Sequence, residues 1–137
     1  MVARRVLTVI ACAVVLAVPP LNAWAAVRAK TAKTVTKTVV GTTVKCHKWG
    51  NIQVQLKIAQ SVVNGKVSKF KILQVTEPIW PQHTVRSVFI NKKALPLLEQ
   101  QVLQLQSGNI ETISGATDVT VSFKESLAAA LLAAKKA

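Results

Sequence analysis

Hydrophobic and polar residues alternate most regularly between residues 52 and 58 of this chain. Polar glutamine and lysine residues separate the apolar positions, which are Ile52, Val54, Leu56 and Ile58. Successive side chains of a strand point to opposite faces, so this pattern predicts a half-buried antiparallel strand.

A further strand is predicted on each side of this one. Residues 38–45 are rich in valine and threonine, which favour strands, and a turn is predicted at residues 49–51. Asn64-Gly65 is a strong hairpin signal. The return strand, residues 66–75, alternates less regularly, which favours a bulge.

Two helices are predicted in the second half of the chain. Pro78 and Pro81 predict a loop over residues 76–82, because proline fits neither a helix interior nor a central strand. The first helix spans residues 91–106, has Pro96 in its first turn, and ends at Ser107-Gly108-Asn109. Its predicted inward face consists of Ala94, Leu97, Leu98, Val102 and Leu105.

Residues 110–113 are predicted to form a short strand, and residues 119–135 a second helix. The predicted inward face of that helix consists of Phe123, Leu127, Ala130, Leu131 and Ala134. The whole pattern predicts the α+β class. It comprises an antiparallel meander of about three strands, a helix, a short return strand and a C-terminal helix.

The N-terminal 25 residues are typical of a secretory signal peptide. Arg4 and Arg5 precede an apolar run over residues 6–18, and Ala23-Trp24-Ala25 resembles a cleavage site. The alternative is an uncleaved anchor, although the run is shorter than a membrane-spanning helix needs. Residues 26–36 are predicted to be a flexible basic linker, and residues 37–137 the domain. An extracytoplasmic location is therefore expected.

The formal net charge of the chain is +13. Cleavage after Ala25 removes two of the 18 basic residues and none of the five acidic ones, which leaves 16 − 5 = +11. Such a charge is compatible with anionic membranes or cell-wall polymers as partners, and the lysines, which are spread along the chain, favour a generally solvated basic surface as the alternative. Export and the lack of aromatic residues among the lysines argue against nucleic acid. Cleavage also removes Cys12, which leaves Cys46 as a single buried thiol without a disulfide partner.

The residues Ser114, Gly115, Ala116 and Thr117 lie between the predicted short strand and the last helix. Glycine gives the backbone freedom at a turn, and the following helix offers unpaired amide groups to an anion. The segment therefore predicts a phosphate-binding turn with a threonine hydroxyl beside it.

This segment resembles the motif of the FMN-binding domain family, roughly Asp-x-x-Ser/Thr-Gly-Ala-Thr-x-Thr/Ser followed by an alanine-rich helix. The family includes the flavin-carrying subunits of Rnf-type and sodium-translocating NADH:quinone oxidoreductase complexes, and also small exported proteins. The resemblance extends over residues 37–134, including 86–91 and 94–98 and the turns at 49–50 and 64–66. Two positions depart from the motif, since Glu111 replaces aspartate and Val119 replaces a hydroxyl residue.

The resemblance implies that the chain binds FMN and transfers electrons. In family members with the full motif, a separate exported flavin transferase joins the FMN phosphate to the last threonine, which corresponds to Thr117. The implied electron partner is a membrane redox protein or a quinone-linked donor or acceptor.

Other candidate site residues follow from their chemistry. Trp80 and Trp49 are candidates for walls of the flavin ring, Arg86 for pairing with phosphate or ring carbonyls, and Glu111 as the acid that leads the motif. The sequence contains no Cys/His spacing typical of a zinc site and no Gly-x-Ser-x-Gly nucleophile elbow, which favours a redox carrier over an enzyme. The alternatives are an FMN enzyme acting on a small substrate, and a basic envelope-binding module without flavin.

Overall fold

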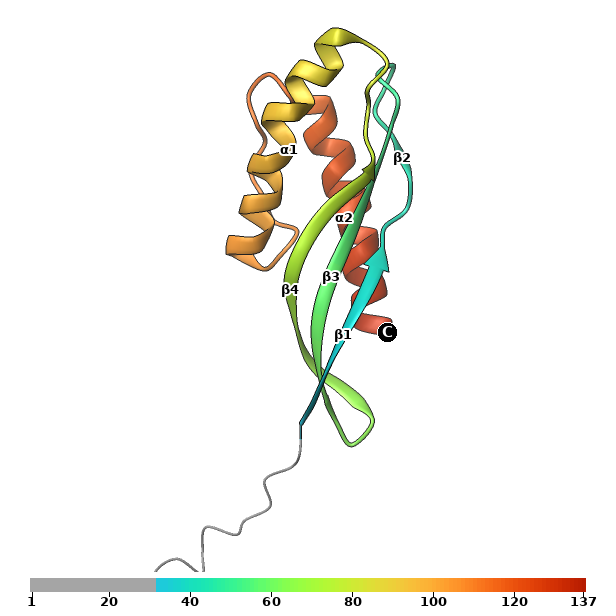
Figure 1. Cartoon of the computed structure of the whole chain (residues 1–137), viewed down its shortest axis with the longest axis vertical. Helices are drawn as coiled ribbons and strands as arrows, with labels where there is room; N and C mark the ends of the chain where they lie inside the picture. Colours follow the sequence, from blue (N-terminus) through green and yellow to red (C-terminus); the bar gives the residue numbers. More distant parts are fainter. Residues whose placement is uncertain (1–31) are drawn as a thin grey trace, which may run out of the picture.

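The segment of regular alternation forms the central strand of an antiparallel sheet in the computed structural model, which describes residues 32–137 (Figure 1). This strand, β3 (Asn51–Val63), pairs on one side with β1 (Lys33–Val40) and β2 (Val44–Lys45). On its other side it pairs with β4 (Lys66–Ile79). Its apolar positions between residues 52 and 58 are fully buried. The predicted α+β class and antiparallel meander are confirmed.

The first predicted strand is interrupted at Gly41, where it meets the helix α2 (Thr117–Lys136). A Cβ atom on Gly41 would collide with the carbonyl oxygen of Ser126 on that helix. The Ser126 hydroxyl donates to the Thr42 carbonyl (2.7 Å) and accepts from the Val54 amide (2.9 Å). A helix side chain therefore replaces the strand partner that the Val54 amide lacks at the interruption.

The hairpin between β3 and β4 forms at Asn64-Gly65, as predicted. Both residues have positive φ, 54° and 75°, which is the backbone of a type I′ turn. The register between the two strands shifts three times, which confirms the predicted irregularity. One of these shifts lies where Gln53 pairs with Ile79 and Gln55 with Thr76.

β4 continues to Ile79, so the prediction of a loop beginning at residue 76 is wrong and the loop begins at Trp80. Pro78 lies in this extension, at the irregularity opposite β3. Among the described residues β4 pairs with β3 alone, so it is an edge strand, the kind of strand in which proline is tolerated.

The first helix, α1 (Val85–Leu105), begins at Val85 rather than at residue 91. The Thr84 hydroxyl caps it by accepting from the Ser87 amide at 3.0 Å. Pro96 therefore lies in the helix interior and not in its first turn, which corrects the prediction. The inward face also differs, because Leu95 is buried while Leu97 and Leu105 are exposed.

Residues 110–113 connect the helices without joining the sheet, so the predicted return strand is wrong. Helix side chains bond their backbone instead, since the Glu111 amide donates to Gln101 Oε1 (2.7 Å). The first helix ends just before residue 107, close to the prediction, at Gln106 in the left-handed conformation. The Gln106 amide group bonds both backbone groups of Ile72 (2.7 and 3.1 Å) and covers the edge of β4.

β1 begins at Lys33, inside the segment predicted to be linker. Residues 33–36 pair with residues 59–62, because β3 is long enough to provide partners for them. The prediction is wrong for residues 33–36, while the signal segment 1–25 and residues 26–31 lie outside the described residues.

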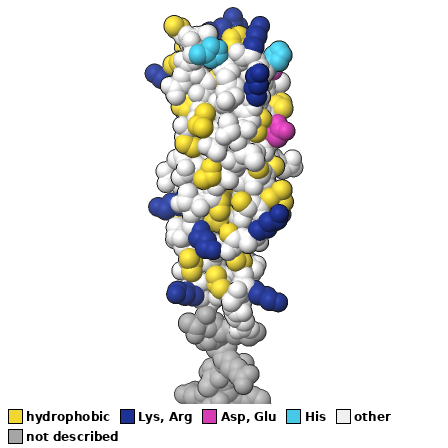
Figure 2. All heavy atoms as spheres, turned by 90° about the vertical axis from the view of Figure 1, so that its right-hand side faces the viewer, with side chains coloured by type: hydrophobic (Ala, Val, Ile, Leu, Met, Phe, Trp, Pro, Cys, Tyr) yellow, Lys and Arg dark blue, Asp and Glu magenta, His cyan; other side chains and the backbone are white. Residues whose placement is uncertain are grey.

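The face of the sheet that the helices leave open carries polar side chains together with the exposed Val40 and Ile79. It carries Lys57 of β3 and threonines of β1, all exposed. Figure 2 shows one side of the molecule, where Lys and Arg side chains are scattered over the half nearest the N-terminal trace and no acidic side chain lies among them.

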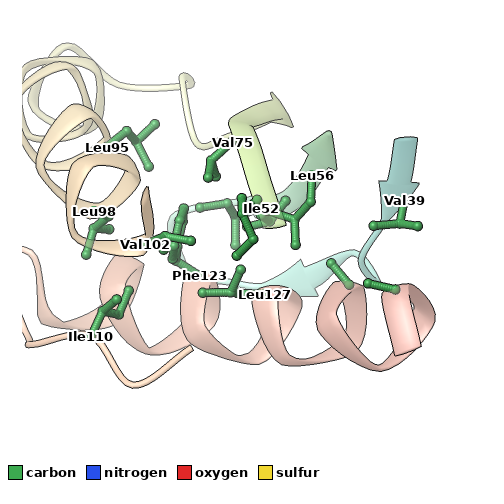
Figure 3. Close-up of a cluster of buried hydrophobic side chains, with 14 of the residues drawn as sticks. Val39, Ile52, Leu56, Val75, Leu95, Leu98, Val102, Ile110, Phe123 and Leu127 are labelled. Atoms are coloured by element: carbon green, nitrogen blue, oxygen red, sulfur yellow. The ribbon is translucent and has the colours of Figure 1, made fainter. Parts of the chain in front are cut away.

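The hydrophobic core lies between the other sheet face and the two helices. In Figure 3, Val39, Ile52, Leu56 and Val75 of the strands point toward the helices. α1 contributes Leu95, Leu98 and Val102, and α2 contributes Phe123, Leu127, Ala130 and Ala134. Of the predicted inward face of α2, Leu131 alone is only partly buried. The position of α2 is therefore set by its apolar face, which leaves its N-terminal turn at one end of the molecule.

Candidate functional site

The Ser114–Thr117 segment forms a tight turn that leads into α2. The Ala116 amide donates to the Ile113 carbonyl at 3.0 Å, and Ala116 itself is buried. Ala116 occupies the N-cap position of α2, which receives no capping hydrogen bond from a side chain of residues 32–137. The first amide groups of this helix are therefore free to bind an anion.

Gly115 is required in this turn by its backbone conformation. Its φ is 82°, a value that residues with a side chain rarely adopt. A Cβ atom there would meet no atom within 4 Å, so the space beside the turn is open.

A pocket of about 410 Å³ opens beside the turn. Residues 115–119 line one wall, and the opposite wall comes from the first two turns of α1 through Arg86, Ser87, Ile90 and Asn91. Trp49, from the turn between β2 and β3, completes the lining. The volume falls within the range of roughly 300–1,000 Å³ that is usual for small-molecule sites. Two helix N-termini meet here, and their dipoles favour a negative group.

Asn91 is a buried polar residue in the pocket lining. It is 1% exposed, and its Nδ2 donates to the Pro81 carbonyl at 2.8 Å. That bond fixes the orientation of the side-chain amide. Its Oδ1 is buried and has no hydrogen-bond partner among the described residues. An unpaired buried acceptor costs about 1–3 kcal/mol. The Oδ1 atom has almost no accessible surface, so a ligand in the pocket would reach it only after the Asn91 side chain moved.

Trp49 and Asp118 are joined across the pocket rim. The indole Nε1 of Trp49 donates to the Asp118 carboxylate at 3.2 Å, and the Lys48 ammonium lies 5.2 Å from the centre of the Trp49 ring. Asp118 is the second residue of α2, so its side chain holds Trp49 rather than capping the helix. The Asp118 carboxylate is therefore directed toward the indole N–H of Trp49.

The structure brings together some of the predicted site residues. Gly115, Ala116, Thr117 and Arg86 line the pocket, and Thr117 and Arg86 are exposed. Ser114 lines a smaller hollow of about 200 Å³ beside it, which also involves Phe89 and Leu97.

Trp80 and Glu111 do not line the pocket. Trp80 is half-buried and packs against the core, whereas Trp49, the other tryptophan considered, takes the place at the pocket. Glu111 is exposed, and its backbone bonds to Gln101 of α1.

The sequence analysis missed the contribution of α1 through Ser87, Ile90 and Asn91. The signal that it overlooked is the capping sequence Thr84-x-x-Ser87, which starts the helix early enough to bring residues 86, 87, 90 and 91 to one face. The prolines at 78 and 81 obscured that start.

Two titratable groups outside the pocket lining have shifted pKa values. Burial raises the pKa of the Cys46 thiol; a hydrogen bond with Ser122 opposes this and the Asp118 charge adds to it, so the thiol is protonated and unreactive. Burial, a hydrogen bond with Glu99 and the charge of Glu99 raise the pKa of Glu77 to about 9. The Glu77 carboxyl is therefore protonated at neutral pH.

Within residues 32–137, the His, Cys, Asp and Glu side chains form no group of three that could hold a metal ion. Over the same residues, no helix has the length and apolar character needed to cross a bilayer.

Comparison with models of known protein families finds none that matches this chain, and comparison with curated proteins finds no relative.

Proposed function

We propose that this chain is an exported FMN-binding domain that transfers electrons. The observation that carries the proposal is the position of the Ser-Gly-Ala-Thr turn, whose Gly115 and Thr117 line the same pocket as Trp49, Arg86 and Asn91. The motif that resembles the FMN-binding family thus lies beside a space of suitable size.

The phosphate end of FMN fits the first turn of α2. Free amide groups there and the exposed guanidinium of Arg86 would bind the phosphate oxygens. The exposed Thr117 hydroxyl is accessible to a flavin transferase, which would form the phosphoester and release the rest of its flavin donor. Covalent attachment would keep the cofactor on a protein outside the cytoplasm.

The ring end of FMN fits the part of the pocket between Trp49 and α1. Trp49 offers an aromatic surface, and a movement of the buried Asn91 side chain would let its Oδ1 accept from the imide N–H that a flavin ring carries. FMN supplies the redox chemistry when bound, and this chain orients it and limits its contact with water. The electron partner would be a membrane redox protein or a quinone-linked donor or acceptor.

The decisive experiment is co-expression of the full chain with an exported flavin transferase, followed by intact-mass measurement and in-gel flavin fluorescence. The expected result is a mass gain equal to one FMN minus water, absent in Thr117→Ala. Thr112→Ala, an exposed threonine outside the pocket lining, is the matched control and should keep the gain.

Yellow native protein without a mass gain would mean non-covalent FMN and would point to Glu111 and Val119, the positions that depart from the family motif. Colourless protein, even after soaking with FMN, would rule out the flavin function. The alternative function would then be an envelope-binding module, which is favoured by the uninterrupted basic charge of the first half of the domain.

A further inference from the structure

Lysines dominate the first part of the described chain. Residues 32–76 contain no acidic residue, and all five acidic residues of the chain lie between Glu77 and Glu125. The eight lysines of this part are Lys33, Lys37, Lys45, Lys48, Lys57, Lys66, Lys69 and Lys71. Positive charge therefore accumulates on β1, β3 and β4 without nearby carboxylates in the sequence.

The strand register gathers several of these lysines on the open face of the sheet. Lys57 follows the outward side of the β3 alternation, and Lys71 and Lys69 pair with the outward positions 59 and 61. Lys66 pairs with Val63 at the start of β4, and all four lysines are exposed. We call these four residues the lysine face.

The neighbours of the lysine face are threonines of β1 together with Leu73 of β4, which is exposed. Thr38 lies directly opposite Lys57, and Thr34 and Thr36 occupy the outward positions of β1 farther along. Aromatic side chains that could stack on bases are missing from these outward positions, which argues against a single-stranded nucleic acid partner. A surface of ammonium and hydroxyl groups can bind closely spaced phosphate groups, and it has no side chain that would recognise nucleic acid bases.

The sequence before β1 indicates which phosphate surface is involved. The apolar run over residues 6–18, preceded by Arg4 and Arg5, is separated from Lys33 by only 14 residues. Lys33 pairs with Val62 next to the β3–β4 hairpin, so the chain enters the fold at the same end as the lysine face. In the alternative in which this segment is an uncleaved anchor, the bilayer that receives the apolar run would lie within reach of this end.

We propose that the lysine face docks the domain on an anionic phospholipid membrane. Each lysine at such a surface strengthens the attraction to acidic headgroups, and the effect fades within a Debye length. The proposal does not depend on flavin. Trp49 of the pocket precedes β3, and Lys66 of the lysine face follows it. The 13 residues of β3 rise ~3.3 Å each, so the two ends of the strand lie about 40 Å apart. Docking by the lysine face would leave the pocket open to a partner.

The test measures partition of the full chain onto vesicles of phosphatidylcholine alone and of phosphatidylcholine with phosphatidylglycerol. Binding through the apolar run occurs on both, so the ratio between the two vesicle types reports the lysine face. We expect a ratio of at least about tenfold for the parent at low salt, lost at high salt.

The variant Lys57→Gln/Lys69→Gln/Lys71→Gln should bring the ratio close to one. The control Lys45→Gln/Lys48→Gln/Lys92→Gln changes net charge equally at other exposed positions and should keep most of it. Far-UV circular dichroism of both variants checks that each is folded.

Equal loss in the two variants would show that net charge alone matters and would overturn the proposal. A parent ratio near one would overturn it as well. Preferential binding to a soluble phosphate-rich wall polymer, lost in the lysine-face variant, would assign the face to that polymer and overturn the membrane proposal.

Discussion

The two ends of β3 differ in how they satisfy their backbone and polar groups. At the hairpin end, β1 pairs with β3 residue by residue, β4 pairs with β3 across two register shifts, and exposed lysines lie among the outward side chains. At the other end the ladder breaks at Gly41 and shifts opposite Pro78, and helix side chains take over as partners. The pocket lies at the end where the first strand breaks at Gly41, and there the N-terminal turns of α1 and α2 both contribute to its lining.

The comparison shows where a small fold has room for a site. A regular ladder uses nearly all its backbone donors and acceptors, whereas helix ends and interruptions leave some unpaired. The pocket end holds an uncapped helix and the unpaired Oδ1 of Asn91. The hairpin end offers charge instead of directed hydrogen bonds, which suits an extended surface rather than a small molecule.

The largest expected effect comes from breaking the interruption that separates the two ends. Gly41→Ala places a methyl group against the Ser126 carbonyl, so β1 or α2 must shift. We expect a loss of about 3 kcal/mol in the free energy of unfolding, at the upper end of the usual cost of overpacking. Urea unfolding followed by circular dichroism measures it. Gly65→Ala, where a Cβ atom meets nothing within 4 Å, is the matched control and should lose much less.

The next effect concerns the raised pKa of Glu77, which lies near the end of β4. Its folded pKa, about 9, lies above the ordinary value of 4.5, so the folded state binds the proton more tightly. The free energy of unfolding should be highest below pH 4.5. It should fall as the pH rises toward 9, by up to about 1.4 kcal/mol per pH unit.

Glu77→Gln should flatten this pH dependence and be more stable than the parent at pH 8, as urea titrations at several pH values would show. Glu99→Gln removes the carboxyl partner and should flatten it in part. A parent whose free energy of unfolding stays constant from pH 5 to pH 9 would contradict the raised pKa of Glu77.

Asn91→Leu tests whether the free acceptor belongs to a ligand site. The change removes the unpaired Oδ1 but also leaves the Pro81 carbonyl without its donor, so we expect stability to change by less than about 1.5 kcal/mol. FMN affinity in the Thr117→Ala background should fall by about tenfold, the value of one hydrogen bond. Flavin fluorescence quenching measures the affinity, and an unchanged affinity would remove Asn91 from the site.

The smallest effect compares one glycine from each end. Gly115 and Gly65 both have positive φ, and a Cβ atom added at either position would meet no other atom within 4 Å. Alanine at either position should therefore cost about 1 kcal/mol from backbone conformation alone. FMN binding should weaken only in Gly115→Ala, and equal weakening in both variants would show that the turn has no special part in binding.

Local signals explain most of what could be predicted. The alternation from Ile52 to Ile58 and the Asn64-Gly65 turn depend on residues adjacent in sequence, and both predictions are confirmed. The helical spacing of Phe123, Leu127 and Ala130 likewise needs only the local period, and it correctly identified the buried face of α2.

Most of the wrong predictions involve partners distant in sequence, although the start of α1 at Val85 depends on the nearby Thr84 cap. Pro78 is tolerated in β4 because no other described strand lies beyond that edge, and residues 110–113 form no strand because Gln101 and Thr120 side chains bond their backbone. The packing of α1 decided that Leu95 faces the core while Leu97 and Leu105 do not.

The sequence by itself determined the strands, the hairpin, the α+β class and the position of the Ser114–Thr117 turn, because period, turn chemistry and charge are properties of neighbouring residues. Only the tertiary structure decided that Trp49, Arg86 and Asn91 meet that turn, and that Trp80 and Glu111 do not. The physical reason is that a pocket is the space left between elements, and that space depends on how their apolar faces pack.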